Sequence, residues 1–352
     1  MIDSSVLLGA EKDKAEQEMK EALNFEMKLA SMSLKKEEER NQTLTYNPFS
    51  LKELTTPPGF PASWLTFFQE YYASNPQLEI DPSERVIIND LAYFKNLSTL
   101  LASVDKKVVA NYLMWRLTDS TMHFLNKVAR DLKETFHMAR DGNSEPPKDW
   151  KRCLKAVGFD NYDETNFIFA ASSMYAKAYF KPEAKEKLEK MVGYLRKAFK
   201  QMVEQNDWMD TDTKEEALKK LQKMNQFIAY PDEILSKEHL DRIYDGLEME
   251  QDSYLDNAMK LRGHMENFLS GQLHEPLDPL DWREHKLVAV VNALYNLDLN
   301  AMEFPAGFLG DPFYNAEVPM YLNFGAIGLV MGHEITHGFD DQGKQKNSDG
   351  MH

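Results

Sequence analysis

The residues whose types and spacing point most directly to chemistry are His333, Glu334 and His337, in the pattern His-Glu-x-x-His. Residues four apart on a helix project from the same face, so both imidazoles can bind one metal ion. Neutral imidazole is a good zinc ligand, and catalytic zinc usually has three protein ligands and one water. A carboxylate at Glu334 can accept a proton from that water. The motif therefore predicts a zinc site with two histidine ligands and Glu334 as general base.

The residues before the motif favour a zinc site over coincidence. A chance occurrence of the pattern is conceivable in a chain with nine histidines. However, residues 325–332 are apolar or small, as in a buried helix that packs closely against its neighbours. Two histidines and a glutamate in such a helix would be costly without a partner such as a metal ion.

A third protein ligand is harder to find in the residues after His337. In one common arrangement the third ligand lies six residues after the second histidine, and here that position is Gly343, which has no side chain. Asp341, Asp349 and His352 remain as alternatives that could reach a metal from a flexible tail.

Composition narrows the class of protein. The formal charge of −16 argues against a nucleic-acid partner or an anionic membrane surface, because both attract an excess of Lys and Arg. Cys153 is the single cysteine, so no intramolecular disulfide can form. The sequence contains no signal peptide and no membrane-spanning stretch, so we expect no membrane segment in this chain and nothing that directs it out of the cytosol.

Helical patterns dominate the first 285 residues. Residues 11–40 and 89–140 are expected to be helical, and Pro182 is well placed to begin a long amphipathic helix. Thr213 and Glu216 form a possible capping box for the next helix. The long helix carries an apolar stripe that should face the core, formed by Leu188, Met191, Val192, Leu195, Phe199, Met202 and Val203.

The pattern changes after Trp282. Residues 286–295 are rich in valine and predict a strand, 296–300 a turn, and 301–304 a returning strand before the helix of the zinc motif. An edge strand next to a zinc helix could hold an extended peptide beside the metal.

Further segments carry a resemblance to a known family. They include the Asn-Ala strand at 291–295 and the segments that follow it, at 304–307, 312–314, 322–328 and 333–341, together with 46–47, 112–116, 150–153, 208–210 and 230–232 upstream. In these segments the chain resembles the neprilysin and endothelin-converting-enzyme family of zinc metallopeptidases.

The resemblance implies a role for each site residue. The two motif histidines would bind one zinc ion, and Glu334 would act on the attacking water. Asn292 would hydrogen-bond the substrate backbone, with the backbone of Ala293 beside it. Asp340 would either support the ligand helix or lie at the surface. Members of this family are plasma-membrane ectodomains or secreted enzymes that cleave small peptides.

The fold implied is mainly α with a small β component. Residues 1–285 would form the mostly helical region, and 286–352 the first strands and zinc-motif helix of an incomplete thermolysin-like catalytic unit. The family's third zinc ligand, a glutamate in a Glu-x-x-x-Asp motif, would lie beyond His352, and the chain would be truncated at both ends. Two functions follow: a neprilysin-type zinc metalloendopeptidase, or a catalytically inactive homologue that acts as a binding or scaffold protein. The missing ligand favours inactivity of these residues alone.

Overall fold

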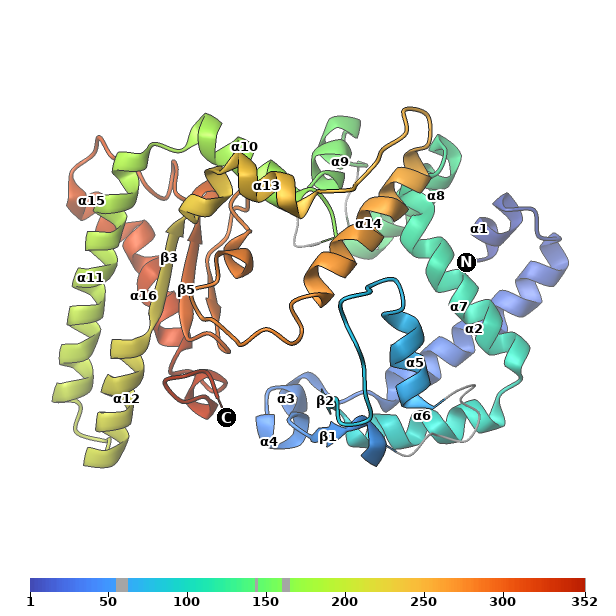
Figure 1. Cartoon of the computed structure of the whole chain (residues 1–352), viewed down its shortest axis with the longest axis horizontal. Coiled ribbons are helices and arrows are strands. Elements are labelled where there is room, and N and C mark those ends of the chain that lie inside the picture. Colours follow the sequence, from blue (N-terminus) through green and yellow to red (C-terminus); the bar gives the residue numbers. More distant parts are fainter. Residues whose placement is uncertain (55–62, 143–144, 160–164, 352) are drawn as a thin grey trace. The chain divides into compact units, whose positions relative to one another are not determined.

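The computed structural model describes residues 1–54, 63–142, 145–159 and 165–351. They form two compact units. The first contains Met1–Lys148 and Glu248–Leu273, and the second contains Asp149–Leu247 and His274–His352. Both are mainly helical, as the sequence predicts (Figure 1).

The first unit is built from helices and one small two-stranded antiparallel sheet. Its elements are α1 (Ile2–Leu7), α2 (Lys12–Met32), α3 (Lys36–Glu39), α4 (Gln42–Thr45), β1 (Pro48–Ser50), η1 (Leu51–Glu53), α5 (Trp64–Tyr71), β2 (Arg85–Ile87), α6 (Leu91–Ser103), α7 (Lys106–Thr121), η2 (Met122–Phe124), α8 (Lys127–Asp141) and α14 (Tyr254–Ser270).

Capping residues decide how the predicted helical segment 89–140 is divided. Asp90, Asp105 and Asn126 each accept a backbone hydrogen bond at the start of α6, α7 and α8. A side-chain acceptor at this position satisfies an amide that has no partner within the helix, so each cap begins a new helix. The last of the three ends at Gly142, whose φ of 72° is the left-handed conformation that glycine adopts readily.

The second unit holds the three-stranded sheet and the zinc motif. Its elements are α9 (Asp149–Ala156), α10 (Ile168–Tyr179), α11 (Pro182–Gln205), α12 (Thr211–Lys223), β3 (Asn225–Ala229), η3 (Asp232–Leu235), α13 (Lys237–Ile243), η4 (Trp282–His285), β4 (Leu294–Asn296), β5 (Ala301–Pro305), η5 (Ala306–Phe308), α15 (Met320–Gly325), α16 (Ile327–His337) and η6 (Gly343–Gln345).

The sheet of the second unit has the order β3-β5-β4. Strands β4 and β5 form the predicted antiparallel hairpin, with the predicted turn between them, and β3 pairs parallel to β5. Every residue of the central strand β5 is buried, whereas β4 is an edge strand.

The prediction of a strand over 286–295 is wrong for most of its length, because only Leu294–Asn296 form β4. Val288 and Val290 are buried and Val291 is 61% exposed, and the segment that holds them forms turns and irregular backbone. Backbone carbonyls in this segment accept hydrogen bonds that are not part of a β-sheet. The carbonyl of Lys286 accepts from Oγ of Ser172 at 2.6 Å, and the carbonyl of Val288 accepts from N of Gly307 at 2.9 Å. Buried valines such as Val288 and Val290 can therefore reflect core packing without strand pairing.

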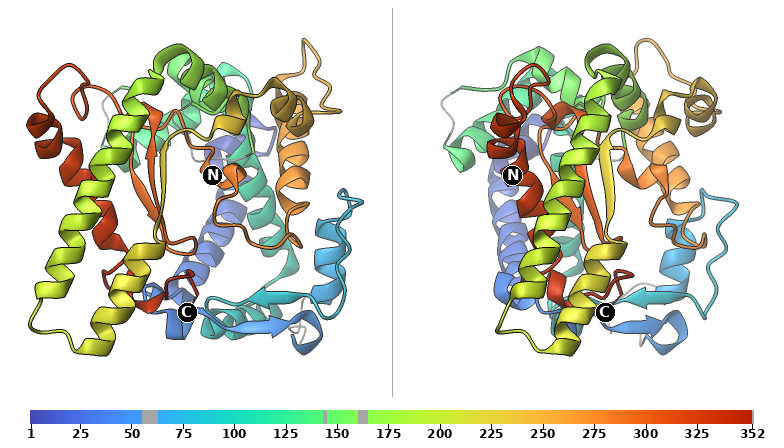
Figure 2. Two further views of the ribbon diagram at one scale, coloured as in Figure 1. Left: turned by 60° about the vertical axis from the view of Figure 1, so that its left-hand side comes forward. Right: turned by 90° about the vertical axis from the view of Figure 1, so that its left-hand side faces the viewer.

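The long helix α11 begins at Pro182, as predicted, and it contacts α12, β3 and α16 (Figure 2). Leu188, Met191 and Val192 are fully buried in this packing, but Met202 from the same predicted stripe is 61% exposed. Helix α16 also contacts β4. The zinc motif is thus held between a long helix and the hairpin.

The predicted capping box at Thr213 and Glu216 is wrong. Helix α12 begins at Thr211, and Oδ1 of Asp210 accepts a hydrogen bond from N of Thr213 at 2.8 Å. Aspartate is as good a cap as threonine, so the earlier acceptor starts the helix. None of the helices within the described residues is both long and apolar enough to span a bilayer.

Candidate metal centre

The imidazoles of His333 and His337 converge at the C-terminal end of α16. Their Nε2 atoms lie 2.9 Å apart, and the two ring planes are nearly perpendicular, at 84°. Two nitrogens that share a metal ion at bonding distances of about 2.0–2.1 Å lie close together in this way. The pair therefore fits two positions of a zinc site.

Asp340 fixes which nitrogen of His337 is free. Its Oδ2 lies 2.8 Å from Nδ1 of His337, and its Oδ1 accepts from the backbone N of Gln342 at 2.9 Å and of Gly343 at 2.7 Å. Burial acts to raise the pKa of Asp340, but the hydrogen bonds outweigh it and the pKa lies below its ordinary value. An ionised Asp340 accepts the Nδ1 proton, which leaves the Nε2 lone pair of His337 available to a metal.

Glu334 is buried in the same helix, with 4% of its surface exposed, whereas His333 is exposed. Burial raises the pKa of this carboxyl, and the charges of His337 and His333 oppose the change. A carboxylate with a raised pKa is a stronger proton acceptor than an ordinary one, which suits a general base.

Asn292 and Ala293 lie directly before the edge strand β4. Asn292 is exposed and Ala293 is buried. Because β4 contacts α16, this segment and the histidine pair belong to adjacent elements of one unit. An extended peptide added along the β4 edge would run beside the zinc motif.

The described part of the chain holds no group of three His, Cys, Asp or Glu side chains that could bind a metal ion. Of the alternatives for a third ligand, Asp349 forms an ion pair with Lys223 at 2.6 Å, and His352 lies outside the described residues. The two histidines fit two positions of a zinc site, and the described residues supply no third side-chain ligand beside them.

Sequence patterns gave little indication of the residues that support the end of α16. Lys220 of α12 is only 5% exposed, and burial lowers its pKa to about 8. Asn300 is buried between the hairpin and the C-terminal residues. One signal was available for Lys220: its spacing from Ala217 and Leu221 places it on the apolar stripe of α12.

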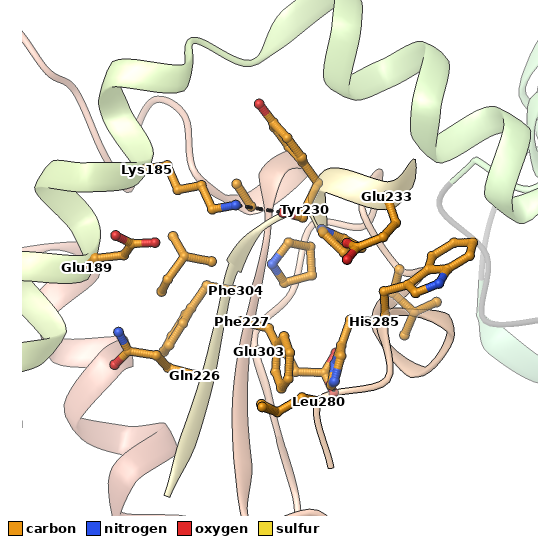
Figure 3. A pocket seen from close by; sticks show the side chains of 16 residues that line it. Lys185, Glu189, Gln226, Phe227, Tyr230, Glu233, Leu280, His285, Glu303 and Phe304 are labelled. Atoms are coloured by element: carbon orange, nitrogen blue, oxygen red, sulfur yellow. Dashed lines mark hydrogen bonds and ion pairs between the residues drawn. The ribbon is translucent and has the colours of Figure 1, made fainter. Parts of the chain in front are cut away.

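A separate cavity of about 240 Å³ lies beside β3 and β5 (Figure 3). The buried pair formed by His285 and Glu303 lines it, with Nδ1 and Oε1 3.1 Å apart, and Phe227 stacks on the imidazole. None of the zinc-motif residues lines this cavity.

Comparison with known proteins places the chain in a family. Two models described as "Peptidase family M13" match residues 1–231 and 292–352. The chain belongs to peptidase family M13. This is a family of zinc-dependent metallopeptidases, so the resemblance inferred from the sequence is confirmed.

Curated M13 relatives match along nearly the whole chain. Neprilysin-2 of Drosophila melanogaster is 35% identical, covering 98% of this chain and 45% of the relative. Endothelin-converting enzyme 1 of Rattus norvegicus is 33% identical, covering 99% of this chain and 45% of the relative. The chain thus spans somewhat less than half the length of these relatives.

Solved M13 structures share the fold. An inhibitor complex of the zinc metalloprotease ZMP1 of Mycobacterium tuberculosis matches with a TM-score of 0.81 and 26% identity, over 97% of this chain and 49% of that one. PepO of Lactobacillus rhamnosis matches with a TM-score of 0.78 and 21% identity, over 99% of this chain and 52% of that one, and this likeness concerns the fold alone.

Proposed function

We propose that this chain provides the zinc-binding helix and the substrate-binding strand of a neprilysin-type metalloendopeptidase that hydrolyses small peptides. The observation that carries the proposal is the convergence of the His333 and His337 Nε2 atoms at 2.9 Å, next to the buried Glu334. The names of the relatives, neprilysin and endothelin-converting enzyme, support a peptide substrate.

Each site residue has a separate role in this proposal. His333 and His337 hold zinc, which supplies Lewis acidity toward a water molecule and the scissile carbonyl when bound. Glu334 accepts a proton at its carboxylate, in a position where burial has already raised its pKa. Asp340 orients His337 through Nδ1, supported by the 2.8 Å contact.

Asn292 and Ala293 would position the substrate. The exposed Asn292 amide can donate to and accept from a peptide backbone, and the Ala293 backbone beside it can add strand-like hydrogen bonds. We also propose that residues 286–352 form the beginning of the catalytic region. Residues 1–285 would form the helical region, which admits small peptides and excludes larger substrates.

The second candidate is a catalytically inactive homologue that binds peptides or a partner. One observation favours it: no third metal-binding side chain joins the histidine pair among the described residues. Catalytic zinc usually has three protein ligands. The chain would then keep the β4 edge and the helical scaffold while lacking turnover.

Zinc content of the purified chain separates the two candidates. We expect one zinc per chain, lost in His337→Ala and retained in Glu334→Gln, and cleavage of a small peptide containing a hydrophobic residue only in the unsubstituted chain. His274→Ala, which changes an exposed histidine of the same unit, is the matched control and should keep both zinc and activity. A chain that binds no zinc would overturn the peptidase proposal and leave peptide binding, measured by titration with the same peptide.

A further inference from the structure

Lys220 is a buried amine with two backbone acceptors. Its Nζ donates to the carbonyl of Gly343 at 2.6 Å and to the carbonyl of Lys346 at 2.9 Å. Both acceptors belong to the loop that follows the zinc-motif helix. A lysine that is 5% exposed bears a desolvation cost, so its presence at this position needs a compensating interaction.

The loop that Lys220 holds is the one that carries Asp340. The backbone N of Gly343 donates to Oδ1 of Asp340 at 2.7 Å, while the carbonyl of the same residue accepts from Lys220. Oδ2 of Asp340 in turn contacts Nδ1 of His337. Three consecutive hydrogen bonds therefore connect α12 to a proposed zinc ligand, with Gly343 in the middle.

The loop around Gly343 is closely packed, so these hydrogen-bonded groups have little room to move. A Cβ on Gly343 would lie 2.0 Å from the carbonyl oxygen of His337, so the loop folds directly against the end of α16. Lys220 holds the loop from its own helix, and its ammonium also attracts the Asp340 carboxylate electrostatically. Asn300 reinforces the same region by donating to the carbonyls of Lys220 and Ser348, each at 3.1 Å.

We propose that Lys220 is a positioning residue: by holding Gly343 it fixes Asp340, and through Asp340 it sets the orientation and tautomer of His337. The consequence for zinc binding rests on the function proposed above. The effect on His337 itself does not, because it operates through protein hydrogen bonds alone.

Lys220→Met tests the idea, because methionine keeps the apolar stem and removes the donors. Lys219→Met is the matched control, since Lys219 lies next to Lys220 on α12, is 53% exposed and forms an ion pair with Glu216. The first readout is the ¹⁵N NMR spectrum of His337 in the metal-free chain, assigned with His337→Gln. We expect Lys220→Met to shift His337 away from the Nδ1–H tautomer and Lys219→Met to leave it unchanged.

The second readout is affinity for zinc and cobalt. We expect Lys220→Met and Asp340→Asn each to weaken binding about 10- to 100-fold, the range typical for groups that support a metal ligand. Because both act through one connection, the double variant should lose little more than either single variant.

An unchanged His337 tautomer in a folded Lys220→Met chain, or fully additive losses in the double variant, would overturn the proposal and leave Lys220 a general stabiliser of the fold. If Lys220→Met does not fold, Lys220→Gln is read in the same way, since its shorter amide keeps one donor group and should give a smaller shift. If even the unsubstituted chain binds no metal, the proposed function fails, and the tautomer of His337 still decides the role of Lys220.

Discussion

The hydroxyl of Tyr295 donates a 2.6 Å hydrogen bond to Oδ1 of Asn300, across the turn of the β4–β5 hairpin. The same Asn300 side chain donates to the carbonyls of Lys220 and Ser348, so one buried amide joins the hairpin, α12 and the C-terminal residues. Its backbone φ of 47° is left-handed, a conformation that asparagine tolerates better than most residues. This position therefore requires both the hydrogen-bonding side chain of Asn300 and its left-handed backbone conformation.

Two substitutions at Asn300 separate these requirements. Asn300→Gly keeps the left-handed backbone and removes three hydrogen bonds, so we expect a loss of about 2–3 kcal/mol in the free energy of unfolding. Asn300→Ala should cost roughly 1 kcal/mol more, because alanine is strained at positive φ. Denaturant unfolding of both variants measures the two values. Equal stabilities would show that backbone strain has no part in the role of Asn300.

Two glycines near the zinc motif should respond in opposite directions to alanine. At Gly343 a Cβ would meet the His337 carbonyl oxygen at 2.0 Å, so Gly343→Ala must displace the loop and should cost more than about 3 kcal/mol. At Gly332, inside α16, a Cβ would meet nothing within 4 Å. Gly332→Ala should therefore stabilise the chain by about 0.5–1 kcal/mol through helix propensity. Thermal unfolding of both variants tests the pair, and a destabilised Gly332→Ala would contradict it.

Glu334→Gln should abolish proton transfer by this side chain without lowering the free energy of unfolding of the chain. The amide cannot act as a base, so peptide cleavage should fall by about 10²–10⁴-fold while the zinc ligands remain. Since burial disfavours the charge of Glu334, the neutral amide should leave the metal-free chain at least as stable as the original. Glu317→Gln, at an exposed position, is the control and should change neither property. Retained cleavage in Glu334→Gln would exclude it as the general base.

The contribution of Lys220 to the free energy of unfolding should change with pH in the alkaline range. Its pKa is lowered from 10.5 to about 8 in the folded chain, so between these values the unfolded chain binds more protons than the folded chain. The free energy of unfolding contributed by this residue therefore rises with pH across that window, by roughly 2 kcal/mol. A neutral amine still has two N–H groups for the two carbonyl acceptors.

The difference in unfolding free energy between the original chain and Lys220→Met isolates this contribution, because other titrating groups are common to both. Measured by denaturant unfolding at several pH values from 8 to 10, this difference should rise. Lys219→Met should give a difference that does not change with pH. A flat result for Lys220→Met would mean that the amine keeps an ordinary pKa in the folded chain.

Local patterns in the sequence were sufficient for the helical fold class, for the start of α11 at Pro182 and for the β4–β5 turn. They were also sufficient for the zinc motif, because a four-residue spacing on a helix places two imidazoles on one face whatever surrounds it. The family followed from the ordered motifs along the chain, and the comparisons confirm it.

Only the tertiary structure decided which polar groups meet. Val288 and Val290 pack in the core without strand pairing, because burial alone does not require a ladder of hydrogen bonds. The bonds from Lys220 to Gly343 and from Asn300 to Ser348 join residues far apart in the chain, so no local pattern encodes them. The sequence thus determined the chemistry of the zinc motif, and tertiary packing determined the hydrogen bonds that hold its histidines in position.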